Sequence, residues 1–138
     1  MKKIKNLIAA LMVTFLLANM VSAIAANTSD TSWSFNFGRI NKNLYTESRS
    51  KQDQSPVYFY VDNFQSGDVL RVRAITGSKK PSSYTPISYI STVGKYCISS
   101  NIYEDGYRSV RVHGQKHSLF STLKADGYWS PDSWSCGW

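Results

Sequence analysis

The chain has 138 residues, which is enough to bury one hydrophobic core but not two. It carries 16 lysines and arginines against nine aspartates and glutamates, for a formal net charge of +7 at pH 7. With only two cysteines, the composition excludes a cysteine-rich scaffold held by several disulfides.

The first 25 residues have the parts of a secretory signal peptide. Lys2, Lys3 and Lys5 form a cationic start, and an apolar run extends from Leu7 to Val21. This run is about 15 residues long, short of the ~20 that a bilayer span needs. We therefore expect residues 1–25 to form a signal-peptide helix that is removed, leaving a secreted protein with no stable membrane span.

Two cleavage sites fit the small residues that a signal peptidase reads. Ala23-Ile24-Ala25 directs cleavage before Ala26, and Val21-Ser22-Ala23 is the alternative. Residues 1–25 contain three of the 16 basic residues and none of the nine acids, so removing them lowers the net charge from +7 to +4. A charge of that size attracts anionic cell-wall polymers, lipid surfaces or nucleic acid weakly, without specifying one of them.

The basic residues of the remaining chain are scattered. A nucleic-acid-binding protein usually gathers its lysines and arginines into a patch or stripe, so we expect no nucleic-acid partner. The only local groupings are Lys79 with Lys80, Arg71 with Arg73, and Arg108 with Arg111.

The two cysteines, Cys97 and Cys136, have no other thiol to compete for either of them. In an oxidising compartment they are predicted to form one disulfide, which closes a loop of about 40 residues and contributes roughly 4 kcal/mol. The alternative, a catalytic or metal-binding thiol, is disfavoured because secreted thiols oxidise and no CxxC motif is present.

The N-terminal half begins with polar residues 26–32, which we expect to be a flexible lead-in to a single domain spanning 33–138. Residues 33–37 alternate aromatic and polar side chains, the period of a strand with one buried face, and Gly38 marks its end. Residues 41–56 are mostly polar and charged and are predicted to be a long loop.

Residues 57–61 and 69–75 are rich in β-forming side chains and flank a turn sequence at 64–68 that contains Gly and Asp. This pattern predicts a β-hairpin. The inward-facing residues are predicted to be Val57, Phe59, Val61, Leu70, Val72 and Ala74, with Tyr58, Tyr60, Arg71 and Arg73 on the opposite faces.

Three more strands are predicted at 87–93, 95–99 and 107–113. Gly94 separates the first two, and Glu104-Asp105-Gly106 forms a turn before the third. Each strand is short, and turn-forming residues bound it on both sides.

The C-terminal part is predicted less regularly: 118–123 fits either a strand or a helical turn, 125–127 is predicted as a turn, and 128–138 as an aromatic tail. No apolar pattern of helical period persists after the first 25 residues. The fold class predicted is all-β, a small antiparallel β-sandwich or barrel of about six or seven strands.

No pattern predicts catalysis or cofactor binding. His113 and His117 have the spacing H-x-x-x-H, but Gly114-Gln115-Lys116 between them breaks a helix, so we expect solvated loop histidines and no metal site. A Gly-x-Ser-x-Gly motif is absent, and most acids lie in predicted turns, namely Asp62, Asp68, Glu104, Asp105, Asp126 and Asp132. We therefore expect that the protein is not an enzyme and needs no cofactor.

The aromatic residues indicate binding. Four tryptophans and nine tyrosines are many for this length, and exposed rings hold carbohydrate by stacking, although large rings also fill the core of a small β domain. The residues predicted to contact a ligand are Tyr128, Trp129, Trp134 and Trp138.

The lysine-rich leader, the single late cysteine pair and the run Gly-Tyr-Trp-Ser-Pro-Asp-Ser at 127–133 resemble the small exported proteins of Gram-positive bacteria. Several of these families are uncharacterised and some are linked to peptide bacteriocins. The leading hypothesis is a secreted, non-enzymatic β-sandwich that binds a surface protein or glycan. The alternative is an antimicrobial, bacteriocin-like protein that acts on bacterial envelopes.

Overall fold

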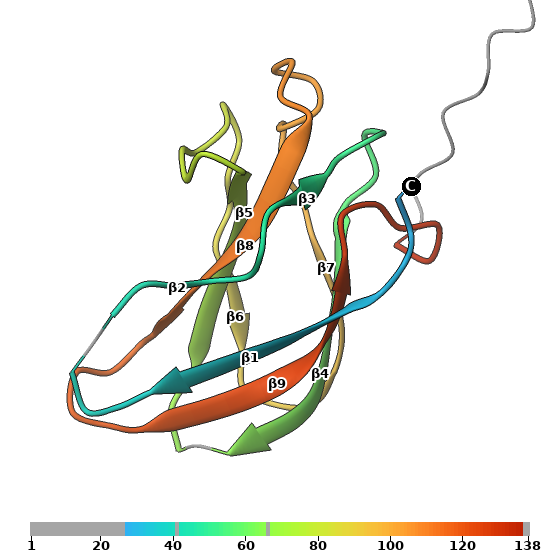
Figure 1. The fold of residues 1–138 in the computed structure, drawn as a ribbon. Helices are drawn as coiled ribbons and strands as arrows, with labels where there is room; N and C mark the ends of the chain where they lie inside the picture. Colours follow the sequence, from blue (N-terminus) through green and yellow to red (C-terminus); the bar gives the residue numbers. More distant parts are fainter. Residues whose placement is uncertain (1–26, 41, 66, 137–138) are drawn as a thin grey trace, which may run out of the picture.

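The computed structural model describes residues 27–40, 42–65 and 67–136; the predicted signal peptide lies outside them. The described residues form an all-β fold with two antiparallel sheets and no helix (Figure 1). None of them, therefore, belongs to a helix long and apolar enough to cross a membrane. The strands are β1 (Thr31–Phe37), β2 (Leu44–Tyr45), β3 (Arg49–Ser50), β4 (Val57–Gln65), β5 (Leu70–Thr76), β6 (Ser88–Ile90), β7 (Gly94–Ile98), β8 (Ser109–Lys116) and β9 (Leu123–Ser130).

The two sheets pack face to face and enclose one core. Sheet A has the strand order β1-β9-β4-β7, and sheet B has the order β2-β8-β5-β6 with β3 also paired to β8. Every pairing is antiparallel. The predicted β-sandwich is confirmed, and the structure contains more strands than predicted because two short ones, β2 and β3, lie in the segment 41–56.

Period-2 alternation places the core as the sequence predicts. Along β1, the buried side chains alternate with exposed Ser34 and Asn36. The inward-facing sets of β4 and β5 are confirmed, since all six predicted residues are fully buried. The core consists of Trp33, Phe35, Phe37, Val57, Phe59, Val61, Leu70, Val72, Ala74, Ile90, Ile98, Ile102, Val110, Val112, Leu123, Ala125 and Trp129.

The predicted hairpin between residues 57–61 and 69–75 is wrong. β4 pairs with β7 and β9 in sheet A, whereas β5 pairs with β6 and β8 in sheet B. The chain therefore crosses from one sheet to the other after β4, so that the apolar faces of the two strands meet across the core instead of lying edge to edge. A short polar link between two amphipathic strands fits both arrangements, and the alternation of side chains does not distinguish them.

The predicted turn at 125–127 is also wrong, because these residues lie inside β9. Gly127 pairs with Trp33 of β1 and with Val61 of β4. A Cβ atom at this position would overlap the carbonyl oxygen of Tyr60. The glycine therefore permits close approach of two backbones beside the β-bulge between Val61 and Asn63, and it does not mark the end of a strand.

Two further segments differ from their predictions. Residues 26–32 were expected to be a flexible lead-in, but β1 already begins at Thr31, and the guanidinium of Arg49 donates to the backbone carbonyl oxygen of Ser29 at 2.7 Å. The segment 118–123 is neither a strand nor a helical turn, because β9 begins only at Leu123.

The predicted disulfide is present. Cys97 of β7 and Cys136 near the C-terminus are joined, with a Cα–Cα distance of 5.6 Å and a sequence separation of 39. Cys97 lies on the outer face of sheet A, opposite Tyr58 of β4. The bond therefore holds the C-terminal segment against the edge strand of this sheet.

We expect the double replacement Cys97→Ser/Cys136→Ser to lower the free energy of unfolding by about 4 kcal/mol, because the unfolded chain regains the freedom that the cross-link removes. Chemical denaturation of both proteins under oxidising conditions measures the difference. Thiol titration of the denatured wild type is the control and should find no free thiol. A variant as stable as the wild type would contradict the stabilising role of the bond.

Candidate functional site

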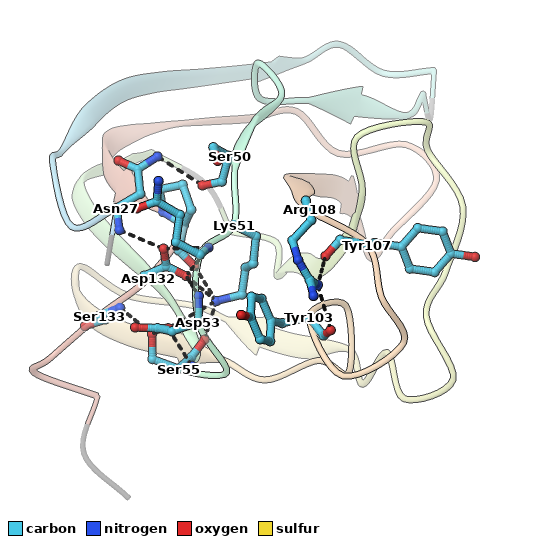
Figure 2. Close-up of polar contacts among 12 residues, drawn as sticks. Asn27, Ser50, Lys51, Asp53, Ser55, Tyr103, Tyr107, Arg108, Asp132 and Ser133 are labelled. Atoms are coloured by element: carbon cyan, nitrogen blue, oxygen red, sulfur yellow. Dashed lines mark hydrogen bonds and ion pairs between the residues drawn. The ribbon is translucent and has the colours of Figure 1, made fainter. Parts of the chain in front are cut away.

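A buried ion pair lies at the end of the sandwich where the C-terminal segment leaves β9. Lys51 and Asp132 are 2% and 0% exposed, and Nζ of Lys51 lies 2.6 Å from Oδ1 of Asp132 (Figure 2). The same ammonium donates to the carbonyl oxygens of Ser55, at 2.5 Å, and Pro131, at 2.9 Å. Three acceptors satisfy its three N–H groups, which offsets the cost of removing the charge from water.

The carboxylate of Asp132 collects backbone donors from two further segments. It accepts hydrogen bonds from the amide of Asn27 at 2.8 Å and from the amide of Gln52 at 3.1 Å. The amide of Ser133 donates to the hydroxyl of Ser55 at 2.8 Å. These bonds lock the N-terminal segment, the 51–56 loop and the C-terminal segment into one unit (Figure 2).

The C-terminal segment leaves one large aromatic ring in solvent. Trp134 is 81% exposed, although its neighbours are fixed on both sides. Asp132 and Ser133 precede it in the buried network, and Cys136 follows it in the disulfide. Lys95 also donates to the carbonyl oxygen of Ser135 at 3.0 Å. The ring is thus presented from a short, anchored segment, which reduces the entropy lost when it contacts a ligand.

Trp134 lies between two hollows. One has a volume of about 470 Å³ and is lined by the 53–56 loop, Tyr103, Ser133, Trp134 and Cys136. The other has a volume of about 310 Å³ and extends over Thr28, Asp30, Tyr58 and the 130–135 segment. Ser133 and Trp134 line both hollows, so a ligand in either one reaches the indole.

Tyr103 is held in the first hollow by Arg108. The guanidinium carbon lies 3.9 Å from the centre of the Tyr103 ring, and Nη1 donates to the carbonyl oxygens of Tyr103 and Tyr107 at 3.0 Å each. In Figure 2 the ring of Tyr107 points away from this network. Beside Tyr103, the pKa of Asp53 is lowered because hydrogen bonds from Ser55 and the charge of Lys51 outweigh partial burial.

The outer face of sheet A extends this surface with tyrosines. Tyr58 and Tyr60 of β4 are on the face opposite the core, and Tyr60 pairs directly with Tyr128 of β9. Tyr128 is 48% exposed and lines a third hollow of about 390 Å³ together with Ser32, Ser34 and Asp62. We call the surface formed by Tyr58, Tyr60, Tyr128 and Trp134 the aromatic face.

Acidic side chains border the aromatic face, and the exposed cation Lys95 of β7 pairs with Tyr60 within it. Asp30 lines the hollow beside Tyr58, and Asp62 and Asp126 line the hollow beside Tyr128. Burial raises the pKa of Tyr58, and the nearby charge of Asp30 adds to this effect. Rings flanked by carboxylates and serine hydroxyls can stack on the C–H faces of a sugar and accept hydrogen bonds from its hydroxyl groups. The same carboxylates repel anionic polymers.

The predicted binding residues separate into three groups. Trp134 and Tyr128 lie on the aromatic face. Trp129 does not, because it is fully buried in the core, and the structure removes it from the candidate set. Trp138 lies outside the described residues. Sequence reasoning did not assign Tyr58 and Tyr60 to the site, although their alternation with a buried apolar set had already placed them on the opposite face.

The histidines are not gathered with carboxylates. His113 was expected in a solvated loop but is 5% exposed in β8, where its Nδ1 accepts from Arg73 at 3.1 Å and its Nε2–H donates to Asn43 at 2.9 Å. Burial lowers its pKa, and the charges of Arg73 and Arg71 lower it further. His117 is exposed and contacts the edge of the Tyr89 ring. Within the described ranges, no group of three or more His, Cys, Asp or Glu residues could hold a metal ion.

Sheet B gathers basic residues that the sequence scatters. Arg71 and Arg73 of β5 share its outer face with His113 and Arg111 of β8. Lys79 joins them by placing its ammonium 4.5 Å from the centre of the Tyr45 ring. Among the described residues, neither the three arginines nor Lys79 forms an ion pair with a carboxylate. The two outer faces of the sandwich therefore differ in charge.

Comparison with known protein families finds one match, over residues 20–133, to a family described as a protein of unknown function, DUF2712. The chain belongs to the DUF2712 family. The matched residues include every strand, the buried pair Lys51–Asp132 and Tyr128 of the aromatic face, and they end just before Trp134 and Cys136. No curated protein and no solved structure matches the chain.

We expect Lys51→Met and Asp132→Asn to lower the free energy of unfolding of this DUF2712 protein by about 3–5 kcal/mol each, because each leaves a buried group without its partner. The double variant should lose less than the sum of the two single variants, since neither charge is then left alone. Denaturant titration measures all four proteins.

Lys80→Met is the matched control, because Lys80 is exposed and its side chain makes no ion pair within the described residues. We expect it to change stability by less than about 0.5 kcal/mol. If Lys51→Met were equally harmless, the buried pair would not hold this end of the sandwich together.

Proposed function

We propose that the protein is exported, is not an enzyme, and binds a neutral glycan of a cell surface or extracellular matrix through the aromatic face. The observation that carries the proposal is the presentation of Tyr58, Tyr60, Tyr128 and Trp134 along one surface, between hollows lined by Asp30, Asp62 and Asp126. Aromatic rings give stacking area, and carboxylates and hydroxyls accept and donate hydrogen bonds to sugar hydroxyls.

Export is supported by two features of the chain. Residues 1–25 have the cationic start, apolar run and small-residue cleavage site of a signal peptide. The Cys97–Cys136 disulfide fits an oxidising compartment, where such bonds persist. Mass spectrometry of the protein from the medium of expressing cells should find an N-terminus at Ala26 or Ile24 and no free thiol. An intact Met1 with reduced cysteines would contradict export.

A neutral ligand is favoured over an anionic one because the carboxylates that line the hollows of this surface outnumber the cation beside Tyr60, which is Lys95. Asp30 and Asp62 are exposed, and Asp126 is partly exposed and accepts a hydrogen bond from the side-chain amide (Nδ2) of Asn63 at 2.9 Å. A polymer of phosphates or uronates would bring like charge close to these carboxylates. A polysaccharide with hydroxyl and acetamido groups meets no such repulsion.

We expect the protein to be retained on insoluble chitin or cellulose, which are uncharged, and Trp134→Ala and Tyr128→Ala each to weaken retention about tenfold through loss of a stacking ring. Tyr84→Ala is the matched control, since Tyr84 is 53% exposed but lies outside the aromatic face. Pull-down isotherms on each polymer measure the effect. Equal retention of all four proteins, or none by the wild type, would contradict the proposal.

A second candidate function is the antimicrobial one, in which the protein acts on bacterial envelopes. One observation favours it, namely the gathering of Arg71, Arg73, Lys79 and Arg111 on the outer face of sheet B. A cationic face attracts anionic bacterial surfaces. Growth inhibition accompanied by dye leakage from anionic vesicles would support this function, whereas retention on cell-wall polymers without leakage would support glycan binding.

A further inference from the structure

The end of the sandwich opposite the C-terminal segment carries an exposed apolar patch. Ile40 follows β1, and Leu119 and Phe120 lie between β8 and β9; these side chains are 86%, 64% and 85% exposed. β1 and β9 meet at this end, where Phe37 pairs with Leu123. We call Ile40, Leu119 and Phe120 the apolar tip.

A buried lysine joins the two segments that form the apolar tip. Lys116 is fully buried, and its ammonium donates to the carbonyl oxygens of Arg39 at 2.6 Å, Leu119 at 3.0 Å and Ser121 at 2.5 Å. These three oxygens belong to the residue before Ile40 and to residues on either side of Phe120. The exposed side chains are therefore held on a fixed backbone whose carbonyl groups point inward.

Asp68 satisfies further polar groups of the same segment. Its carboxylate accepts from the amide of Ser118 at 3.0 Å, from the hydroxyl of Ser118 at 2.9 Å and from the hydroxyl of Ser121. Burial alone would raise its pKa, but the hydrogen bonds from Ser121, Val69 and Ser118 outweigh burial and hold the pKa at about 2. Asp68 is therefore ionised at neutral pH and remains a strong acceptor for these groups.

The hydrogen bonds from Lys116 and to Asp68 satisfy backbone groups of this loop, as insertion into lipid requires. A polar backbone group that enters the membrane without a partner costs several kcal/mol. At the apolar tip, the backbone carbonyls of Arg39, Leu119 and Ser121 already accept hydrogen bonds from Lys116. The apolar side chains of the tip can therefore enter a membrane interface without removing water from these carbonyls. In an apolar loop whose carbonyls faced solvent, each carbonyl would lose its hydrogen bonds to water on entering lipid.

The charge at this end selects the kind of surface. Arg39 and Lys42 are exposed beside Ile40, and Lys124 is exposed at the start of β9. Asp68 is the only acid in the described parts of the loops at this end, which are 38–40 with 42–43, 67–69, 91–93 and 117–122, and it is buried. Exposed cations around apolar side chains, with no exposed acid, complement anionic headgroups.

We propose that the apolar tip docks into the headgroup region of an anionic lipid surface, with Phe120, Leu119 and Ile40 entering the interface and Arg39 and Lys42 contacting lipid phosphates. Three side chains are too few for a stable interface between two proteins, which buries about 800 Å² on each partner. They suffice for reversible membrane binding when cations assist. In this orientation the segment that follows β9, which carries the exposed Trp134, lies at the other end of the sandwich (Figure 1).

The test compares binding to vesicles of phosphatidylcholine alone and of phosphatidylcholine with an equal amount of phosphatidylglycerol, by co-sedimentation. We expect binding to the anionic vesicles, weakened about tenfold by Phe120→Ser through loss of buried apolar area. Arg39→Gln and Lys42→Gln should each weaken binding about fivefold, and added salt should weaken the wild type. All proteins are expressed from the full-length sequence and recovered after processing, because an uncleaved apolar leader with Lys2, Lys3 and Lys5 would itself bind anionic vesicles.

Trp134→Ala is the control and should bind vesicles like the wild type, while Phe120→Ser should keep wild-type retention on polysaccharides. Failure of the glycan proposal and failure of the lipid proposal are thereby distinguishable. An unchanged Tm of Phe120→Ser shows that it is folded. The lipid proposal is overturned if the wild type ignores anionic vesicles, if Phe120→Ser binds them as well, or if that variant instead loses self-association seen in the wild type. Release of an entrapped dye would overturn shallow docking.

Discussion

Burial of the Lys51–Asp132 pair is the constraint on which the end of the sandwich that carries Trp134 depends. A charged ammonium and a charged carboxylate are stable inside a protein only when nearly all of their hydrogen-bonding capacity is used. Here that requirement brings Ser55, Pro131 and the amides of Asn27 and Gln52 to the same point. The geometry of the pair thus fixes where the C-terminal segment runs, and with it the position of Trp134. The disulfide then holds the other side of the same segment.

The sandwich separates its charges by surface, which lets one small domain offer two different chemistries. Carboxylates accompany the tyrosines on the outer face of sheet A, while arginines gather on the outer face of sheet B. Lys116 and Asp68 use buried charge in yet another way, by turning the polar groups of a loop inward so that its apolar side chains are left outside. The buried charges of Lys116 and Asp68 act by orienting the backbone carbonyls and hydroxyls of the loop, and not by pairing with each other.

The local pattern of the sequence was enough to predict the fold class, the disulfide and most of the core, because alternation decides which side chains a strand buries. It was not enough to predict pairing, since β4 and β5 look like a hairpin whether they share a sheet or face each other across the core. Gly127 was misassigned because a glycine needed for backbone contact looks like a glycine needed for a turn. Lys51, Asp132 and Lys116 gave no signal, because a buried charge is recognisable only once its distant partners are known. Trp134 and Tyr128 entered the candidate site from their residue type alone, whereas Tyr58 and Tyr60 entered it only once the strand register was known.

The pairing of β1 with β9 couples folding to the order in which the chain is made. Among the described residues, β1 pairs within sheet A with β9 alone, about 90 residues later, so ribosomal synthesis of the N-terminal half yields a sheet with an unfilled gap and exposed apolar side chains. The sandwich closes only after β9 has been synthesised. On the proposal that the chain is exported, a translocation channel that accepts unfolded chains would receive it before the sandwich closes, and the domain would fold on the far side.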